Sequence, residues 1–229
     1  MIFSKFLKKK WQHKNSVVRI EAINNSLSVE DEEQRDIIAE LAKADDNENV
    51  RRAALIKLNS YSTWLAHSQE NSMVKIKQYA HKKVETILTD QDDITVTEQE
   101  KFDYIANHND YKFFEQWLKI AEQTSLIITL FEKLNSKSLT KGASTESTIK
   151  PQLLVNLFNQ KQNSEVQQYI LEKVHDVETL DKLKKKALNT EITNQIETKI
   201  TALQFAIEQP LILSKKVNSD TAFITFLNG

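Results

Sequence analysis

Apolar residues recur along the whole chain at the three- and four-residue spacing that places them on one face of an α-helix. In the first such stretch, Val18, Ala22 and Ile23 mark the apolar face. Because the same spacing continues to the end of the sequence, it predicts an all-helical protein. The predicted helices cover residues 15–26, 30–43, about 50–58, 71–88, 97–105, 110–121, 125–135, 151–161, 163–174, 177–188, 190–208, 210–217 and 220–227.

Polar segments separate some of these helices and predict where they begin. Thr97-Glu-Gln-Glu100 follows a polar stretch and has the pattern of a capping box, and Ser28-Val-Glu-Asp31 predicts another helix start. Residues 135–148 are rich in Ser and Thr and hold Gly142, the only internal glycine, so we expect a flexible loop or a joint between subdomains there. The expected organisation is amino-terminal helical repeats over 1–134, a flexible loop over 135–149 and further helical repeats over 150–229.

A short motif of the form Asn-x-x-Val-basic occurs three times in the first third of the chain. It begins at Asn15, Asn47 and Asn71, with spacings of 32 and 24 residues. In the first two copies an alanine, Ala22 or Ala54, follows the valine by four positions. Internal similarity at such a period is typical of helical repeat proteins. Weaker copies begin at Asn163 and Asn189.

Each part of this motif has a physical reason. An asparagine at the start of a helix accepts hydrogen bonds from the free amides of the first turn. The valine and the alanine four positions later share one helix face, and the small alanine lets a neighbouring helix approach closely. Since one helix pair cannot bury its apolar face alone, we expect the pairs to stack on each other.

The motif carries a resemblance to a known family. The segment from Asp45 to Leu55 resembles the second helix of a HEAT repeat, with its Asp-(few)-Val-Arg-x-x-Ala pattern, and Asn15 to Ile23 is similar without the upstream aspartate. The resemblance implies an all-α, armadillo-like fold in which antiparallel helix pairs form a superhelical solenoid. It also implies a structural role for Arg19 and Arg51, because the arginine of the pattern commonly pairs with an aspartate at a turn.

Two other segments resemble uncharacterised bacterial proteins that carry HEAT-like repeats ahead of a long helical domain of unknown function. They are the opening from Phe3 to His13 and the segment from His175 to Ala187. No function comes with this resemblance. It leaves open whether the chain is part of a longer protein.

Composition strengthens the helical prediction and narrows the chemistry. The chain has two glycines and two prolines in 229 residues, against average usages of about 7% and about 5%. Because hairpins, bulges and phosphate-binding loops need glycine, a β-rich or doubly wound fold is disfavoured. The absence of cysteine, of a long apolar run and of a signal peptide leads us to expect a cytoplasmic protein without a membrane span.

No motif for catalysis or for cofactor binding is recognisable. Nucleotide-binding loops need clustered glycines, which the chain lacks, and its five histidines form no metal-binding pair. Asp90, Asp92 and Asp93 superficially resemble a calcium loop, but the required glycine and closing glutamate are missing. We therefore expect no enzyme activity, no cofactor and no metal site.

Clusters of basic residues are the candidate binding sites. Lys8, Lys9, Lys10 and Trp11 belong to a predicted amphipathic helix at the amino terminus, which could dock on a membrane surface, a nucleic acid or a protein. The alternative is an end cap whose aromatic residues close the first repeat. Trp64, Trp117, Phe113 and Phe114 are expected in the core. Two other basic positions are candidates for partner binding, Arg52 and the run of Lys184, Lys185 and Lys186, although the run is most simply one exposed helix face.

Three hypotheses about function follow. The first is a non-catalytic scaffold that offers a concave helical surface to a protein partner. The second is a nucleic-acid-binding protein, either like the HEAT-like alkylpurine DNA glycosylases or RNA-associated, although a formal net charge of −1 is low for such a protein. The third is a helper domain for an attached region. The sequence leaves the oligomeric state and the partner open.

Overall fold

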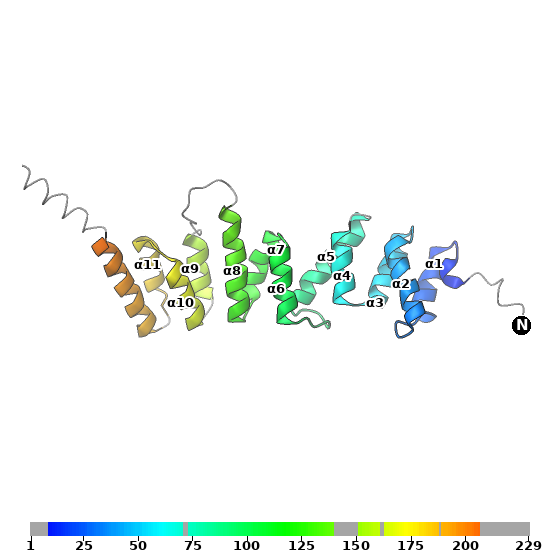
Figure 1. Cartoon of the computed structure of the whole chain (residues 1–229), viewed down its shortest axis with the longest axis horizontal. Coiled ribbons are helices and arrows are strands. Elements are labelled where there is room, and N and C mark those ends of the chain that lie inside the picture. Colours follow the sequence, from blue (N-terminus) through cyan, green and yellow to red (C-terminus); the bar gives the residue numbers. More distant parts are fainter. Residues whose placement is uncertain (1–8, 71–72, 140–150, 161–162, 188, 207–229) are drawn as a thin grey trace, which may run out of the picture. The chain divides into compact units, whose positions relative to one another are not determined.

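The computed structural model describes residues 9–70, 73–139, 151–160, 163–187 and 189–206. All regular elements in these ranges are helical, so the predicted all-α class is confirmed (Figure 1). The first elements are a 3-10 turn η2, Lys10–Gln12, and the helices α1, Ser16–Asn25, α2, Glu32–Ala44, α3, Glu48–Leu58, α4, Tyr61–Gln69, and α5, Val74–Leu88. They are followed by α6, Glu98–Asn107, α7, Tyr111–Ile120, α8, Thr124–Leu139, α9, Pro151–Gln160, α10, Ser164–Lys173, α11, Val177–Lys184, and a helix over 190–206.

Most predicted helices are found close to their predicted bounds, and the main exception is α4. No helix was predicted over Tyr61–Gln69, because the residues that this helix buries are Trp64, His67 and Ser68. Two of these three are polar, so the apolar spacing that marks a helix is missing. The helices predicted over 210–217 and 220–227 lie outside the described residues.

The chain divides into two compact units, Met1–Lys101 (unit 1) and Phe102–Gly229 (unit 2). This division differs from the predicted one, which placed a loop over 135–149. In the structure α8 continues to Leu139, so the first part of that segment is helical. Residues 140–149 lie outside the described residues, and the continuation of the repeats as one superhelix stays a prediction.

Unit 1 is built from helix pairs in two layers (Figure 1). Helix α2 packs against α3, and α4 packs against α5. Contacts between α1 and α3 and between α3 and α5 place these three helices in one of the two layers. The side chains at these contacts include Ala22, Ala54 and Ala80, which are fully buried. Because alanine has a single methyl group, it permits the close approach of helices that the sequence predicts.

The third copy of the sequence motif is out of register with the structure. Met73 is the N-cap of α5 and makes no side-chain capping bond, while Asn71 lies outside the described residues. Val74 is 68% exposed, whereas Ile76 is 4% exposed and Ala80 is buried. Ile76 and Ala80 therefore take the positions that Val50 and Ala54 have in α3, and the predicted equivalence of Val74 to Val50 is wrong.

The other predicted helix starts are confirmed by capping hydrogen bonds. Asn15, Asn47, Asn163 and Asn189 each accept a hydrogen bond from a first-turn backbone amide through the side-chain oxygen. Thr97 and Glu100 form a reciprocal capping box, in which each residue's backbone amide donates to the other's side chain. The segment Ser28–Asp31 also starts a helix, with Asp31 as the N-cap of α2.

In unit 2, α7 packs against α8, and α10 packs against α8 and α9. The predicted core residues Phe113, Phe114 and Trp117 are buried here, as Trp64 is in unit 1. Gln167 follows its capping asparagine by four positions, as Arg19 and Arg51 follow theirs. It is fully buried, and its Nε2 donates to the carbonyl of Phe158 at 3.1 Å. A neutral amide thus takes the place of the arginine at this position of the motif.

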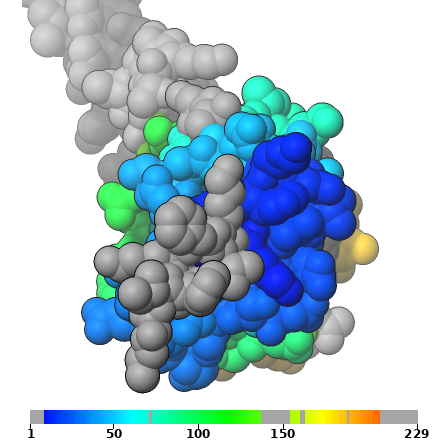
Figure 2. Space-filling view, turned by 90° about the vertical axis from the view of Figure 1, so that its right-hand side faces the viewer, coloured from blue at the N-terminus to red at the C-terminus, as the bar shows by residue number. Residues whose placement is uncertain are grey.

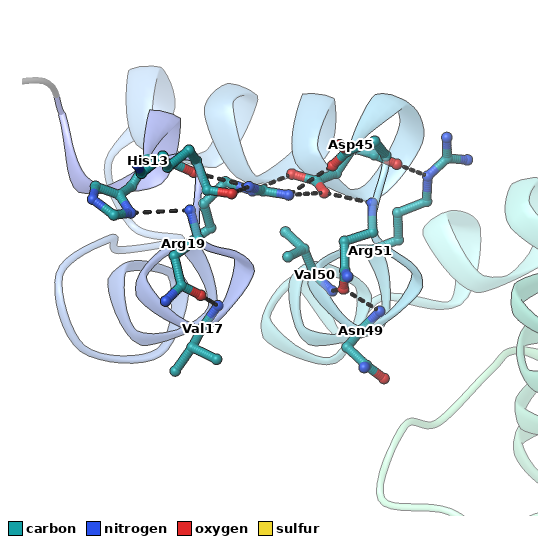
Figure 3. Close-up of polar contacts among 11 residues, drawn as sticks. His13, Val17, Arg19, Asp45, Asn49, Val50 and Arg51 are labelled. Carbon is teal, nitrogen blue, oxygen red and sulfur yellow. Dashed lines mark hydrogen bonds and ion pairs between the residues drawn. The ribbon is translucent and has the colours of Figure 1, made fainter.

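One residue, Asp45, links α1, α2 and α3 through its carboxylate and its backbone carbonyl (Figure 3). Arg19 of α1 donates to both carboxylate oxygens of Asp45, from Nε at 2.8 Å and from Nη2 at 2.7 Å. The side chains are 10% and 5% exposed, respectively. Arg19 also donates from Nη1 to the carbonyl of His13 at 2.8 Å, and Arg51 of α3 donates to the backbone carbonyl of Asp45. Arg19 therefore pairs with an aspartate at a turn, as the HEAT resemblance implies, whereas Arg51 contacts the backbone of the same residue.

The surroundings of Asp45 make its charged form the stable one. Burial is the largest single influence and raises the pKa of Asp45. Hydrogen bonds from Arg19 and from the backbone amide of Asn47, together with the charge of Arg19, lower the pKa by more than burial raises it. The net result is a pKa below the usual 3.8. Because the folded state holds the proton less tightly than the unfolded chain does, this stabilisation is present above the unfolded pKa. It is lost as the pH falls through the folded pKa.

We expect Asp45→Asn to lower the free energy of unfolding of unit 1 by about 3 kcal/mol, because it leaves the buried guanidinium of Arg19 without its bidentate partner. Urea denaturation followed by circular dichroism measures the loss, and amide hydrogen exchange in α1 and α3 assigns it to unit 1. The matched control is Asp46→Asn, since Asp46 also contacts Arg19 at 2.7 Å but is 91% exposed. Equal effects of the two substitutions would contradict the role given to Asp45.

We expect Ala54→Leu to destabilise unit 1 by about 1–3 kcal/mol, because the larger side chain has no space between packed helices. Ala53→Leu is the control, since Ala53 is only half-buried on the same helix. Thermal unfolding measures both variants. A stability of the Ala54 variant equal to that of the control would show that the close approach of α3 to its neighbours is not needed.

Candidate functional site

The amino-terminal candidates do not form the predicted continuous helix. Lys9 has a non-helical backbone, with φ −52° and ψ 131°, and only the short turn η2 follows it. The helix prediction is therefore wrong at Lys9. After the turn the chain is extended at His13, and the carbonyls of His13 and Lys14 accept hydrogen bonds from Arg19, so no helix continues past Gln12. Lys8 lies outside the described residues.

The contacts of η2 favour the end-cap interpretation. The turn packs against α1, and Trp11 is half-buried beneath Lys9, whose Nζ lies 5.1 Å from the centre of the indole ring. Lys10 is exposed. Figure 2 shows this end of unit 1, where the described residues of η2 and α1, in dark blue, form much of the surface.

Arg52 takes part in a stack of side chains from three helices of unit 1. Its guanidinium, on α3, lies 4.3 Å from the ring centre of Tyr79 on α5. Tyr79 in turn meets Trp64 of α4 edge to face, with ring centres 5.6 Å apart. Such cation–π contacts stabilise by about 0.5–1 kcal/mol at exposed sites. The ring face of Tyr79 that Arg52 covers is therefore not open to a ligand.

The lysine run of unit 2 is divided between a helix and the residues after it. Helix α11 ends at Lys184, so the prediction of a single helix face over the run is wrong. Lys184 forms an ion pair with Glu197 at 2.7 Å, and the hydrogen bond within this pair raises the pKa of the lysine. Lys185 and Lys186 are exposed. Of the described candidates, the structure brings Lys9 onto the ring of Trp11, while Arg52 and Lys184 contact residues outside the candidate set.

A groove between α2 and α4 of unit 1 is a site that sequence reasoning missed. It has a volume of about 420 Å³. Side chains at four-residue spacing along α2 form one wall, and α4 forms the other. The lining residues are Arg35, Asp36, Ala39, Lys43, Leu58, Ser62, Thr63, Ala66 and His67. The spacing of Arg35, Ala39 and Lys43 was visible in the sequence, but the second wall was not, because α4 was not predicted.

Cations without partners give this groove its electrostatic character. Arg35 and Lys43 are exposed, and among the described residues neither side chain has a hydrogen-bond or ion-pair partner. Asp36 lies beside Arg35 and is exposed too. Ala39 and Ala66 contribute only methyl groups. The groove therefore combines a small apolar floor with charged side chains that are available to a ligand.

His67 is the buried titratable group of the groove. Its side chain is 10% exposed, and Nδ1 lies 3.5 Å from the carboxylate of Glu70. Burial lowers the pKa of His67 most strongly; the charge of Glu70 raises it, and the charges of Arg51 and Lys43 lower it. The net result is a pKa below 6.5, so the imidazole is neutral at pH 7. The positive charges of Lys43 on α2 and Arg51 on α3 therefore act on the imidazole of His67.

A second hollow borders the helix over 190–206 of unit 2. It has a volume of about 610 Å³ and is lined by Thr190, Glu191, Asn194, Gln195, Thr198, Lys199 and Ala202. The ammonium of Lys199 is already used, because it donates to the carbonyl of Leu171 at 2.6 Å. All the named lining residues come from one helix. The groove of unit 1, with walls from two helices and unpaired cations, is the better-defined site.

We expect Lys43→Gln to raise the pKa of His67, because it removes one of the positive charges that disfavour the imidazolium. Arg35→Gln is the matched control, since Arg35 is not among the groups that shift this pKa. The titration of the His67 ring protons, followed by nuclear magnetic resonance, measures both. A shift of equal size in the control would show that the effect comes from the net charge of the protein rather than from the groove.

None of the helices in the described parts of the chain has the length and apolar character needed to cross a bilayer. Comparison of the whole chain with protein-family models, with curated proteins and with solved structures finds no match.

Proposed function

We propose that the chain is a non-catalytic binding module with a HEAT-like arrangement of helix pairs, and that unit 1 presents the α2–α4 groove to a protein partner. The observation that carries the proposal is the pair of unpartnered cations, Arg35 and Lys43, beside a floor of small residues. Charged side chains that stabilise no part of the fold are available for recognition. The same cannot be said of Arg52 or Lys184, which have partners within their own unit.

The construction of the groove supports this role. Both walls are helices, and each wall is one member of a packed pair, α2 with α3 and α4 with α5. Asp45, which follows α2 directly, is held by Arg19 and Arg51. A preformed surface on rigid elements loses little conformational entropy when it binds, which favours affinity.

The polar contacts of the groove favour binding rather than chemistry. A nucleophilic hydroxyl needs a base within hydrogen-bond reach, about 2.6–3.2 Å. Among the described residues, the polar partner of His67 is Glu70, and the hydroxyl of Ser62 lies near that of Ser60. No pairing of a nucleophile with a base supports a catalytic role here.

Nucleic-acid binding remains the alternative, and the charges of α2 argue against this groove as its site. This helix carries Glu32, Glu33, Asp36 and Glu40 against Arg35, Lys43 and no other cation. A phosphate backbone needs a continuous positive surface, and binding to it weakens steeply with salt. Salt-dependent binding of an oligonucleotide that groove substitutions leave unchanged would place a nucleic-acid site elsewhere on the protein.

We expect Ala39→Trp to abolish binding of the natural partner, because the indole would fill the groove. Ala44→Trp is the matched control, since Ala44 is an exposed residue of the same helix and does not line the groove. The full-length protein serves as bait in a lysate of the organism that carries the gene, and the retained proteins are identified by mass spectrometry. Binding of the purified partner is then measured by calorimetry.

The outcomes of this experiment separate the hypotheses. A partner lost by Ala39→Trp and kept by Ala44→Trp supports the groove. A partner kept by both variants contradicts the groove as its site. A bait that specifically retains no protein contradicts the binding-module proposal itself.

A further inference from the structure

We propose that the α2–α4 groove binds an acidic peptide segment of its partner, with one carboxylate at Arg35 and a second at Lys43. This inference rests on the proposed function and adds the chemical class of the ligand. It comes from the placement of the charges along α2, and it does not depend on the identity of the partner.

The distance between the two cations indicates a ligand with two separated anionic groups. Arg35 and Lys43 are eight residues apart on one helix, which at about 1.5 Å per residue separates their Cα atoms by about 12 Å. A ligand with two anionic groups about that far apart can pair with both cations without either side chain bending toward the other. An extended peptide advances about 3.3 Å per residue, so side chains four positions apart are about 13 Å apart and point to the same face. Two acidic residues at that spacing match the two cations.

The lining between the cations fits the middle of such a peptide. Ala39 lies halfway between Arg35 and Lys43 along α2, and its small side chain leaves space for an apolar side chain of the peptide. The hydroxyl groups of Ser62 and Thr63 on the other wall also line the groove and are suited to polar contacts with an extended backbone. An apolar lining with a few placed polar groups is the usual composition of a binding cleft.

The negative charge of Asp36 favours a peptide over a nucleic acid as the ligand of the groove. Its carboxylate lines the same groove beside Arg35. A nucleic-acid strand carries a negative charge on every nucleotide, so one phosphate would meet Asp36 at close range. A peptide can place a neutral or basic residue there and keep its acidic residues for the cations. The alternation of charge along α2 therefore favours a peptide of mixed charge pattern.

His67 provides a readout at the Lys43 end of the groove. The groups that act on it are Lys43 from α2, Arg51 from α3 and Glu70 at the end of α4. A carboxylate bound at Lys43 would offset the positive charge near the imidazole. We therefore expect the pKa of His67 to rise when the peptide binds, so that binding strengthens as the pH falls through the pKa of the imidazole in the peptide complex.

The test uses the full-length protein and a fluorescein-labelled nine-residue peptide with glutamates at positions three and seven, leucine at position five and serine elsewhere. Fluorescence polarisation at low ionic strength measures its dissociation constant. We expect Arg35→Gln and Lys43→Gln each to weaken binding by about two- to fivefold, as for exposed ion pairs. Lys14→Gln is the matched control, because it removes an exposed charge of unit 1 outside the groove.

Two further probes test the geometry. In one peptide both glutamates are glutamines, and in the other the glutamates are adjacent. Both are expected to bind several times more weakly than the first peptide. Equal binding of the peptide with adjacent glutamates would overturn the two-point arrangement, as would equal effects of Lys14→Gln and Lys43→Gln. Binding of the first peptide without a change in the His67 titration would place it outside the groove and would also overturn the inference.

Failure of this inference can be told apart from failure of the proposed function. If no peptide binds but a natural partner is lost by Ala39→Trp, the groove binds a partner of another chemistry, and only the acidic-peptide inference is overturned. If a single-stranded oligonucleotide competes with the peptide at equal charge and with higher affinity, the ligand is a nucleic acid and the inference is again overturned. If neither the peptide nor a groove-dependent partner is found, both proposals fall.

Discussion

The bidentate ion pair between Arg19 and Asp45 is the interaction on which the rest of unit 1 depends. It joins the first helix of the α1–α3–α5 layer to the turn between α2 and α3. The backbone of the same aspartate accepts from Arg51, and its side chain accepts from the amide of Asn47, the N-cap of α3. Because one residue satisfies donors from α1, α3 and the turn, the position of α2 is fixed at its carboxyl end, where Lys43 enters the groove.

Local chemistry made part of the fold predictable. Asn15 and Asn47 could be recognised as helix starts because a capping bond involves only neighbouring residues. The role of Arg19 followed from the family resemblance, although its partner Asp45 lies 26 residues away. Prediction failed where tertiary packing overrides the local pattern. Helix α4 buries His67 and Ser68, so its amphipathic signal is weak.

The candidate site was harder to predict, because the meaning of a basic residue depends on its surroundings. The sequence marked basic residues as candidate binding sites. In the structure Lys184 is paired with Glu197, and Arg52 covers the ring of Tyr79. Arg35 and Lys43 stand alone in the sequence and have no partner among the described residues. Their groove needs a second helix, which only the three-dimensional arrangement supplies.

The substitution of glutamine for arginine within the motif gives the two units different responses to acid. In unit 1 the joint at Arg19 contains a carboxylate whose protonation removes half of an ion pair. The equivalent joint in unit 2 holds the neutral amide of Gln167 against the carbonyl of Phe158, and neither group titrates. The contact in unit 1 therefore responds to protonation, and the contact in unit 2 does not. Acidification through the folded pKa of Asp45, which lies below 3.8, loosens the joint of unit 1, while that of unit 2 keeps its hydrogen bond.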